Sequence, residues 1–155
     1  TRSGVYSVSF DTETVSDLFG EQSVLVGGLF CIVDASFNTL IKKGYDENVA
    51  WLVCFYELKN IVNSIYDLGF YDFFKEISHN AQIGSEKIIN SKLYTRISKE
   101  FLSLINDIED GTFDKYLESD QSQKNYSNFI KSYKNSKFNK TDKKLRESFK
   151  LTSND

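Results

Sequence analysis

Apolar residues crowd the first half of the chain and become sparse toward its C-terminal end. Between residues 17 and 43 they fall on nearly every face of a helix, and the same holds between residues 47 and 68. A helix that is apolar on all sides requires a covered environment. We therefore predict that these two helices form a buried hairpin and the core of the domain. Polar residues, among them Asp17, Glu21 and Asp34, interrupt the first run and argue against a membrane span.

The ends of the two long helices carry recognisable signals. Candidate caps for the first helix lie between Thr12 and Ser16, and the run 42–44 places two lysines and a glycine at its end. Asp46 is a candidate cap for the second helix, and Gly69 is its predicted stop.

The rest of the chain predicts shorter helices, and its first ten residues predict an extended segment. Apolar and polar positions alternate over residues 1–10, which is typical of a short strand. The predicted helices cover residues 71–77, 84–89, 94–110, 126–133 and 141–149. The fold class is therefore all-α, with a short strand-like start.

Composition narrows the classes of function. With 155 residues the chain is the size of one domain, and its net charge of −3 lacks the basic footprint of a nucleic-acid-binding protein. Two cysteines and one histidine exclude a disulfide framework and a closed structural zinc site. The chain lacks methionine and shows no signal-peptide layout. We expect it to be a piece of a longer protein.

Asp17 and Glu21 form the first candidate site. Four residues apart on a helix, their carboxylates share one face, and two such groups can hold a hard cation such as Mg²⁺. The alternative is that both acids occupy a first helical turn, where the helix dipole favours negative charge. Gly20 and the pair 27–28 also lie inside the predicted helix, where glycine is unfavourable. We expect a close approach to the backbone there.

Two further candidates lie in the middle of the chain. Glu57 stands among apolar neighbours, where a buried carboxylate would need a partner in a salt bridge or a catalytic site. The polar run 78–80, Ser-His-Asn, could bind substrate oxygens or could form a turn capped by its own side chains. Cys31 and Cys54 fall in apolar helices and are expected to be packing residues, and Trp51 is expected in the core.

Several motifs resemble those of ketol-acid reductoisomerases. The longest runs from residue 16 to 25 (SDLFGEQSVL), and the segment 50–62 is similar to the family at matching spacing. The runs 77–81, 107–113 and 144–146 also fit. The resemblance covers essentially the whole chain and is nearest to the short, class I form of the enzyme.

The resemblance implies a domain organisation and an activity. Residues 1–8 would be the tail of an N-terminal Rossmann domain that binds NADPH, and residues 9–155 a knotted, all-helical C-terminal domain. The family isomerises 2-acetolactate or 2-aceto-2-hydroxybutyrate by a Mg²⁺-dependent alkyl migration. It then reduces the product with NADPH to a 2,3-dihydroxy acid, in valine, leucine and isoleucine biosynthesis. The resemblance further implies a homodimer or higher homo-oligomer that binds no nucleic acid or membrane. The enzyme would be cytoplasmic in a bacterium and organellar in a eukaryote.

The resemblance also assigns roles to residues. Asp17 would bridge two Mg²⁺ ions and Glu21 would complete the shell of one. Glu57 would be a catalytic and metal-site residue that contacts the substrate hydroxyl and metal-bound water. Ser78 would bind the substrate carboxylate, with the second-helix and serine groups reaching the site of a partner subunit. No cofactor-binding residue is expected in this chain, which would lack reductase activity by itself.

Val53 departs from the family pattern. The family has a metal-binding glutamate one turn before Glu57, and valine offers no donor atom at that position. One alternative is therefore a degenerate relative that keeps the fold as a non-catalytic dimerisation module. Another is an unrelated helical carboxylate–metal protein, which would need a second pair of carboxylates facing Asp17 and Glu21.

Overall fold

The structure, a computed structural model, describes residues 6–150, and every regular element within that range is a helix. The elements are α1 (Phe10–Gly20), the π-helical segment η1 (Glu21–Leu25), α2 (Gly27–Lys42), α3 (Glu47–Trp51), the π-helical segment η2 (Leu52–Tyr56), α4 (Leu58–Leu68), α5 (Phe70–Glu76), α6 (His79–Ile89), α7 (Lys92–Glu109), α8 (Thr112–Leu117), α9 (Asp120–Lys134) and α10 (Lys137–Ser148). The all-α class is confirmed, and the knot stays a prediction.

The first long helix begins earlier than its apolar pattern indicates. Ser9 caps α1 by accepting a hydrogen bond from the Thr12 backbone N–H over 3.1 Å. The predicted strand over residues 1–10 is therefore wrong for the described residues 6–10, where a helix cap follows a short irregular segment with no neighbouring strand to pair with. Residues 1–5 lie outside the described residues. Apolar periodicity missed α1 because its first two turns are largely polar.

The turn between the long helices follows the sequence signals. Asp46 Oδ1 accepts hydrogen bonds from the backbone N–H groups of Asn48 at 2.8 Å and Val49 at 3.1 Å. These bonds hold the pKa of the Asp46 carboxyl below its ordinary value, because they favour the charged form. Gly44 and Gly69 both take positive φ angles, 86° and 75°, that a glycine adopts without a steric penalty.

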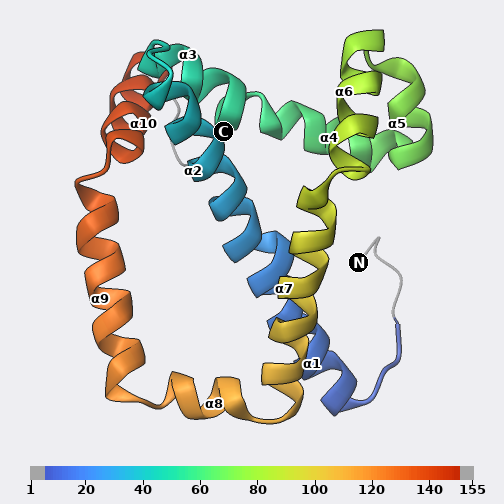
Figure 1. The fold of residues 1–155 in the computed structure, drawn as a ribbon, viewed down its shortest axis with the longest axis vertical. Coiled ribbons are helices and arrows are strands. Elements are labelled where there is room, and N and C mark those ends of the chain that lie inside the picture. The colour runs from blue at the N-terminus through green and yellow to red at the C-terminus, as the bar shows by residue number, and fades with distance from the viewer. Residues whose placement is uncertain (1–5, 151–155) are drawn as a thin grey trace.

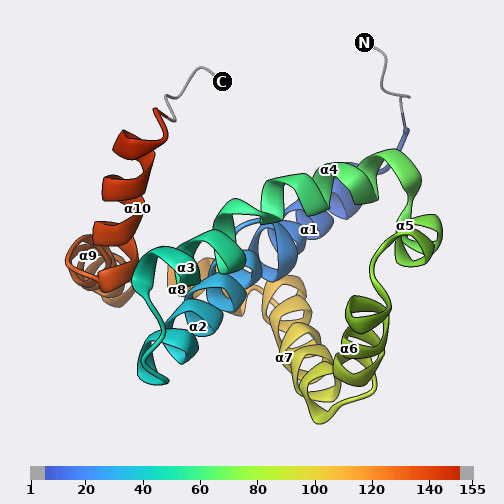
Figure 2. The same cartoon turned by 90° about the horizontal axis from the view of Figure 1, so that it is seen from above.

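The helices form an open frame rather than a closed bundle (Figure 1). α1 and α2 run diagonally through it, α3 and α10 meet at one end of α2, and α7 packs against α1 near the other. The view from above shows α9 and α10 on one side and α5, α6 and α7 on the other (Figure 2). This layout leaves much helix surface uncovered by other helices among residues 6–150.

The buried core lies at the corner where α2, α3 and α10 meet. Its members are Val33, Phe37, Ala50, Trp51, Phe138 and Leu145. Phe37 and Trp51 are fully buried, which confirms the prediction for Trp51. The Trp51 indole Nε1–H donates to Asp142 Oδ1 over 3.0 Å, and Arg146 Nε donates to both oxygens of the same carboxylate. A long-range network thus ties α3 to α10.

The prediction that both long helices are buried along their length is wrong for this chain. Leu25 is 61% exposed and Ile61 is 43% exposed, and the apolar run around Leu25 is open to solvent. By length and composition alone, the continuous helix Phe10–Lys42 could cross a membrane, and only 11% of its most apolar window is buried. The interruptions at Asp17 and Glu21 therefore do not by themselves exclude a span. Apolar periodicity shows that a face needs cover, not which element supplies it.

The C-terminal half holds more helix than its polar sequence indicates. The expected short helix over 126–133 is the C-terminal part of α9, which begins six residues earlier, and α10 begins four residues before the predicted 141. Ser119 and Ser136 cap these helices by accepting bonds from Ser122 N and Asn139 N. Capping supplies a start signal that does not depend on an apolar stripe.

Candidate functional site

Asp17 and Glu21 lie on one face at the end of α1. The Glu21 backbone N–H donates to Asp17 O, so the two residues are separated by one α-helical turn. Both are exposed. The dipole explanation for these acids is wrong, because α1 begins at Phe10 and its first turn is occupied by Asp11 and Glu13. Asp17 and Glu21 thus stand inside the continuous helix Phe10–Lys42, away from its first turn, and lack that structural reason.

A π-turn follows Glu21 directly. The Val26 N–H donates to Glu21 O over 3.0 Å, an i→i+5 bond, and α-helical bonding resumes from Val26 O to Phe30 N. The expected close backbone approach is present at Gly27 and Gly28, which come next, and wrong at Gly20, where a Cβ would be in ordinary contact with a Leu25 side-chain carbon at 3.7 Å. A Cβ on Gly27 would lie 2.5 Å from Gln22 O, and one on Gly28 only 1.7 Å from Ser23 O.

The side chains inside this π-turn were not singled out by the sequence. Ser23 is buried, and the Gln22 amide nitrogen is buried with no hydrogen-bond partner among the described residues. A buried donor without a partner is costly. The glycine pair was the only sequence signal that pointed to this turn.

Glu57 follows the second π-turn. Its N–H donates to Leu52 O over 3.1 Å, again an i→i+5 bond. The expectation of a buried, partnered carboxylate is wrong, because Glu57 is exposed and takes part in none of the ion pairs found within residues 6–150. Val53, one turn earlier, is 51% exposed and supplies no donor. π-Helical turns are frequent at functional sites. Glu21 begins the first of them and Glu57 directly follows the second.

Ser78 performs a capping role in the structure. Its Oγ accepts a hydrogen bond from Ala81 N over 3.3 Å and so caps α6. Gln82 donates its side-chain amide to Phe74 O over 2.9 Å and fastens the same turn to α5. Ser78, His79 and Asn80 are all exposed, so the cap leaves them open to contact.

The chain does not gather its candidate carboxylates into one cluster. Within residues 6–150, no three Asp, Glu, His or Cys side chains are close enough together to hold a metal ion. Asp17 and Glu21 still fit Mg²⁺, which is commonly held by one or two carboxylates with water and substrate oxygens completing its shell. Glu57 belongs to a different helix and does not join this pair.

The two cysteines differ from each other. Cys54 is partly buried, and burial raises the pKa of its thiol above the ordinary value. Cys31 is exposed on α2, so its expected role as a packing residue is wrong within this chain.

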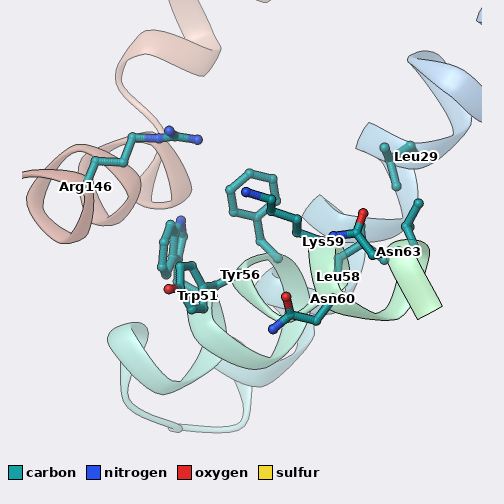
Figure 3. Close-up of a pocket in the computed structure, with 10 residues that line it drawn as sticks. Leu29, Trp51, Tyr56, Leu58, Lys59, Asn60, Asn63 and Arg146 are labelled. Atoms are coloured by element: carbon teal, nitrogen blue, oxygen red, sulfur yellow. The ribbon is translucent and has the colours of Figure 1, made fainter. Parts of the chain in front are cut away.

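A pocket of about 500 Å³ opens beside the core corner, between η2, α4 and α10 (Figure 3). Trp51, Phe55 and Tyr56 form its aromatic side, and Lys59 and Arg146 bring two cations. The Arg146 guanidinium is paired with the Asp142 carboxylate at 2.9 Å, which reduces its availability to an anion. Two of the lining residues, Tyr56 and Leu58, flank Glu57 in the sequence. None of the predicted site residues lines the pocket.

Comparison with known proteins finds one family across this chain. A family model described as "Ketol-acid reductoisomerase, C-terminal domain" matches residues 10–151. A ketol-acid reductoisomerase (NADP(+)) from Leuconostoc mesenteroides is 34% identical over 148 residues, 94% of this chain and 42% of that protein. One from Campylobacter hominis is 40% identical over 115 residues, 74% of this chain and 34% of that protein.

A solved structure shares the fold. It is an NADH-preferring ketol-acid reductoisomerase from an uncultured archaeon, with a TM-score of 0.74 and 23% sequence identity. The match covers 90% of this chain and 43% of that one. The chain thus spans less than half the length of the relatives it matches.

Proposed function

We propose that this chain, which belongs to the ketol-acid reductoisomerase C-terminal domain family, supplies metal- and substrate-binding groups of such an enzyme. Its membership rests on the family match over residues 10–151. The whole reaction would be the Mg²⁺-dependent alkyl migration of 2-acetolactate or 2-aceto-2-hydroxybutyrate, followed by reduction with NADPH. Residues 9–155 would form the C-terminal domain, and residues 1–8 would be the end of the NADPH-binding domain. The assembled enzyme would be cytoplasmic in a bacterium.

The observation that carries this proposal is the exposed carboxylate pair of Asp17 and Glu21 on one helix face, directly before an exposed apolar run. Neither acid has an ion-pair partner among residues 6–150, and neither occupies the first helical turn. Asp17 and Glu21 would hold Mg²⁺, which supplies Lewis acidity toward the oxygens of a hydroxy-keto acid. The two residues thereby fix where the substrate oxygens lie on this helix face.

Glu57 and Ser78 would act in a site completed by a partner subunit. Both are exposed, and Glu57 lies apart from Asp17 and Glu21 within the chain. Glu57 would accept or hold a proton at the substrate hydroxyl, and Ser78 Oγ would hydrogen-bond the substrate carboxylate. The exposed apolar face around Leu25 favours a homodimer or higher homo-oligomer, because burial of such a face is a strong driving force for association.

The test replaces Asp17 in the full-length enzyme. Asp17→Asn keeps the size of the side chain and removes its charge, so it should abolish Mg²⁺-dependent isomerisation. Asp11→Asn is the matched control, since Asp11 is an exposed acid near the start of the same helix. Isomerase activity is measured across a magnesium titration. Normal activity in the Asp17→Asn variant would contradict the assignment.

Val53 favours a second candidate, a non-catalytic dimerisation module of the same fold. Its exposed side chain offers no oxygen at a position where the family places a glutamate. We expect Val53→Glu to lower the magnesium concentration needed for activity in the full-length protein. An inactive wild type together with an inactive Val53→Glu variant would favour the module. Equal magnesium dependence and turnover in two active proteins would show that position 53 does not face the metal site.

A further inference from the structure

The junction between α1 and α2 shows why two adjacent glycines occupy the interior of a helix. Helical bonding changes at this point from α to π and back, through the i→i+5 bond from Val26 N to Glu21 O. Val26 itself has φ −122° and ψ −67°, away from α-helical values. The two residues after it, Gly27 and Gly28, approach the carbonyls of the widened turn.

The approach is too close for any side chain. Cβ atoms on Gly27 and Gly28 would lie 2.5 Å and 1.7 Å from the carbonyl oxygens of Gln22 and Ser23. Both obstacles are backbone atoms, which cannot move aside as the end of a flexible side chain can. Alanine at either position therefore requires the π-turn itself to change. Gly84 provides the contrast, because it also lies within a helix and a Cβ there would have nothing within 4 Å.

The π-turn controls where the carboxylate pair points. An α-helix rotates by about 100° per residue, and a turn closed by an i→i+5 bond holds one residue more than an α-turn. Loss of the π-turn would therefore rotate Asp17 and Glu21 by about one such step relative to α2. α2 is anchored by Val33 and Phe37 in the buried core, so its own orientation is fixed. The two carboxylates would then no longer point in their native direction relative to α2.

We propose that Gly27 and Gly28 are positioning residues for the Asp17–Glu21 carboxylate pair, because they permit the π-turn that orients this pair relative to the α2 core face. The proposal rests on the proposed function, in which the pair holds Mg²⁺. It assigns no contact with metal or substrate to the glycines themselves. A second π-turn stands directly before Glu57, so the same device adjoins both proposed acidic parts of the site.

The experiment measures Mg²⁺ binding directly, by calorimetry on the full-length protein without substrate. The variants are Gly27→Ala and Gly28→Ala, with Gly84→Ala as the matched control and Asp17→Asn as the reference for a lost ligand. Loss of a group that orients metal ligands typically weakens affinity by about 10–100-fold. We expect that range for both glycine variants and no change for Gly84→Ala. NADPH affinity should be unchanged in all four, because that cofactor would bind another domain.

A folding defect is separated from a positioning effect by circular dichroism and by a deletion. Removing Val24 takes one residue out of the π-turn, adds no Cβ and keeps every carboxylate. With one residue fewer the turn closes as an α-turn and keeps the flanking helices in their native phase, so this deletion should retain its helical signal and, combined with Gly27→Ala or Gly28→Ala, should restore native Mg²⁺ affinity. If a glycine variant loses its helical signal, recovery of both the signal and the Mg²⁺ affinity in the combined variant separates the positioning effect from misfolding.

The outcomes separate the two proposals. Native Mg²⁺ affinity in the alanine variants, or weak binding that persists when the Val24 deletion is combined with them, with Asp17→Asn impaired, would overturn the positioning role and leave the proposed function standing. Native affinity in Asp17→Asn would overturn the metal assignment, and the positioning role that depends on it. Weak binding in the two glycine variants and in Asp17→Asn, with native affinity recovered when the Val24 deletion is combined with either glycine variant, would support both.

Discussion

The part of α2 around Val33 and Phe37 and the segment Val24–Val26 just before α2 are both rich in apolar residues, but they have different surroundings. Val33 and Phe37 pack against α3 and α10, with Phe37 and Phe138 in edge-to-face contact at 5.1 Å between ring centroids. Val24, Leu25 and Val26 are each more than 60% exposed. The core corner is stabilised by residues far apart in the sequence, whereas the side chains around Leu25 are left exposed by residues 6–150.

This difference indicates that the core corner stabilises the single chain, whereas the open region is suited to association with another chain. The core corner is complete within one chain, and its network from Trp51 through Asp142 to Arg146 satisfies the buried indole N–H. The open region carries the Asp17–Glu21 pair and the buried, unpartnered Gln22 amide nitrogen. A surface that covered Leu25 would lie beside these polar groups, so we expect assembly and the proposed site to be coupled.

The largest effect should come from emptying the core corner. Phe37→Ala removes a fully buried ring, and such changes cost about 3–5 kcal/mol. The free energy of unfolding is measured by urea denaturation, and the loss should be the same at all protein concentrations. A loss below about 0.5 kcal/mol, the range of surface changes, would mean that this corner is not the core.

A smaller effect should follow from breaking the polar link in the same corner. Asp142→Ala leaves the Trp51 indole N–H without its acceptor, and an unpaired buried donor costs about 1–3 kcal/mol. Asp142→Asn is the matched control, because its side-chain oxygen can still accept this bond. It loses only the ion pair to Arg146, which is 46% exposed and so contributes at most about 1 kcal/mol. Equal losses in both variants would show that the ion pair, not the indole bond, stabilises the corner.

The smallest effect on the unassembled chain should come from the open region. Leu25→Ala should change its free energy of unfolding by no more than about 0.5 kcal/mol, because the side chain is already exposed. The same variant should weaken self-association, measured by analytical ultracentrifugation over a dilution series. A loss comparable with that of Phe37→Ala at every concentration would remove the distinction between the two regions.

Local sequence signals were enough to predict the helical class, the two long helices and the turn between them. Local chemistry sets these features: Asp46 satisfies the first N–H groups of its helix, and Gly44 and Gly69 adopt the positive φ angles that end helices. The spacing of Asp17 and Glu21 likewise places them on one helix face without any tertiary contact. Motif resemblance identified the family, and the glycine pair predicted a close backbone approach.

Which apolar positions are covered depends on the packing of helices far apart in the sequence. Periodicity gives the same signal for Leu25 and Phe37, because it records the side chain and not the element packed against it. Tertiary packing also leaves Glu57 exposed and apart from Asp17 and Glu21. The π-turn also lay beyond the sequence pattern, since a single i→i+5 bond changes the direction of a helix face without changing the order of residues along it.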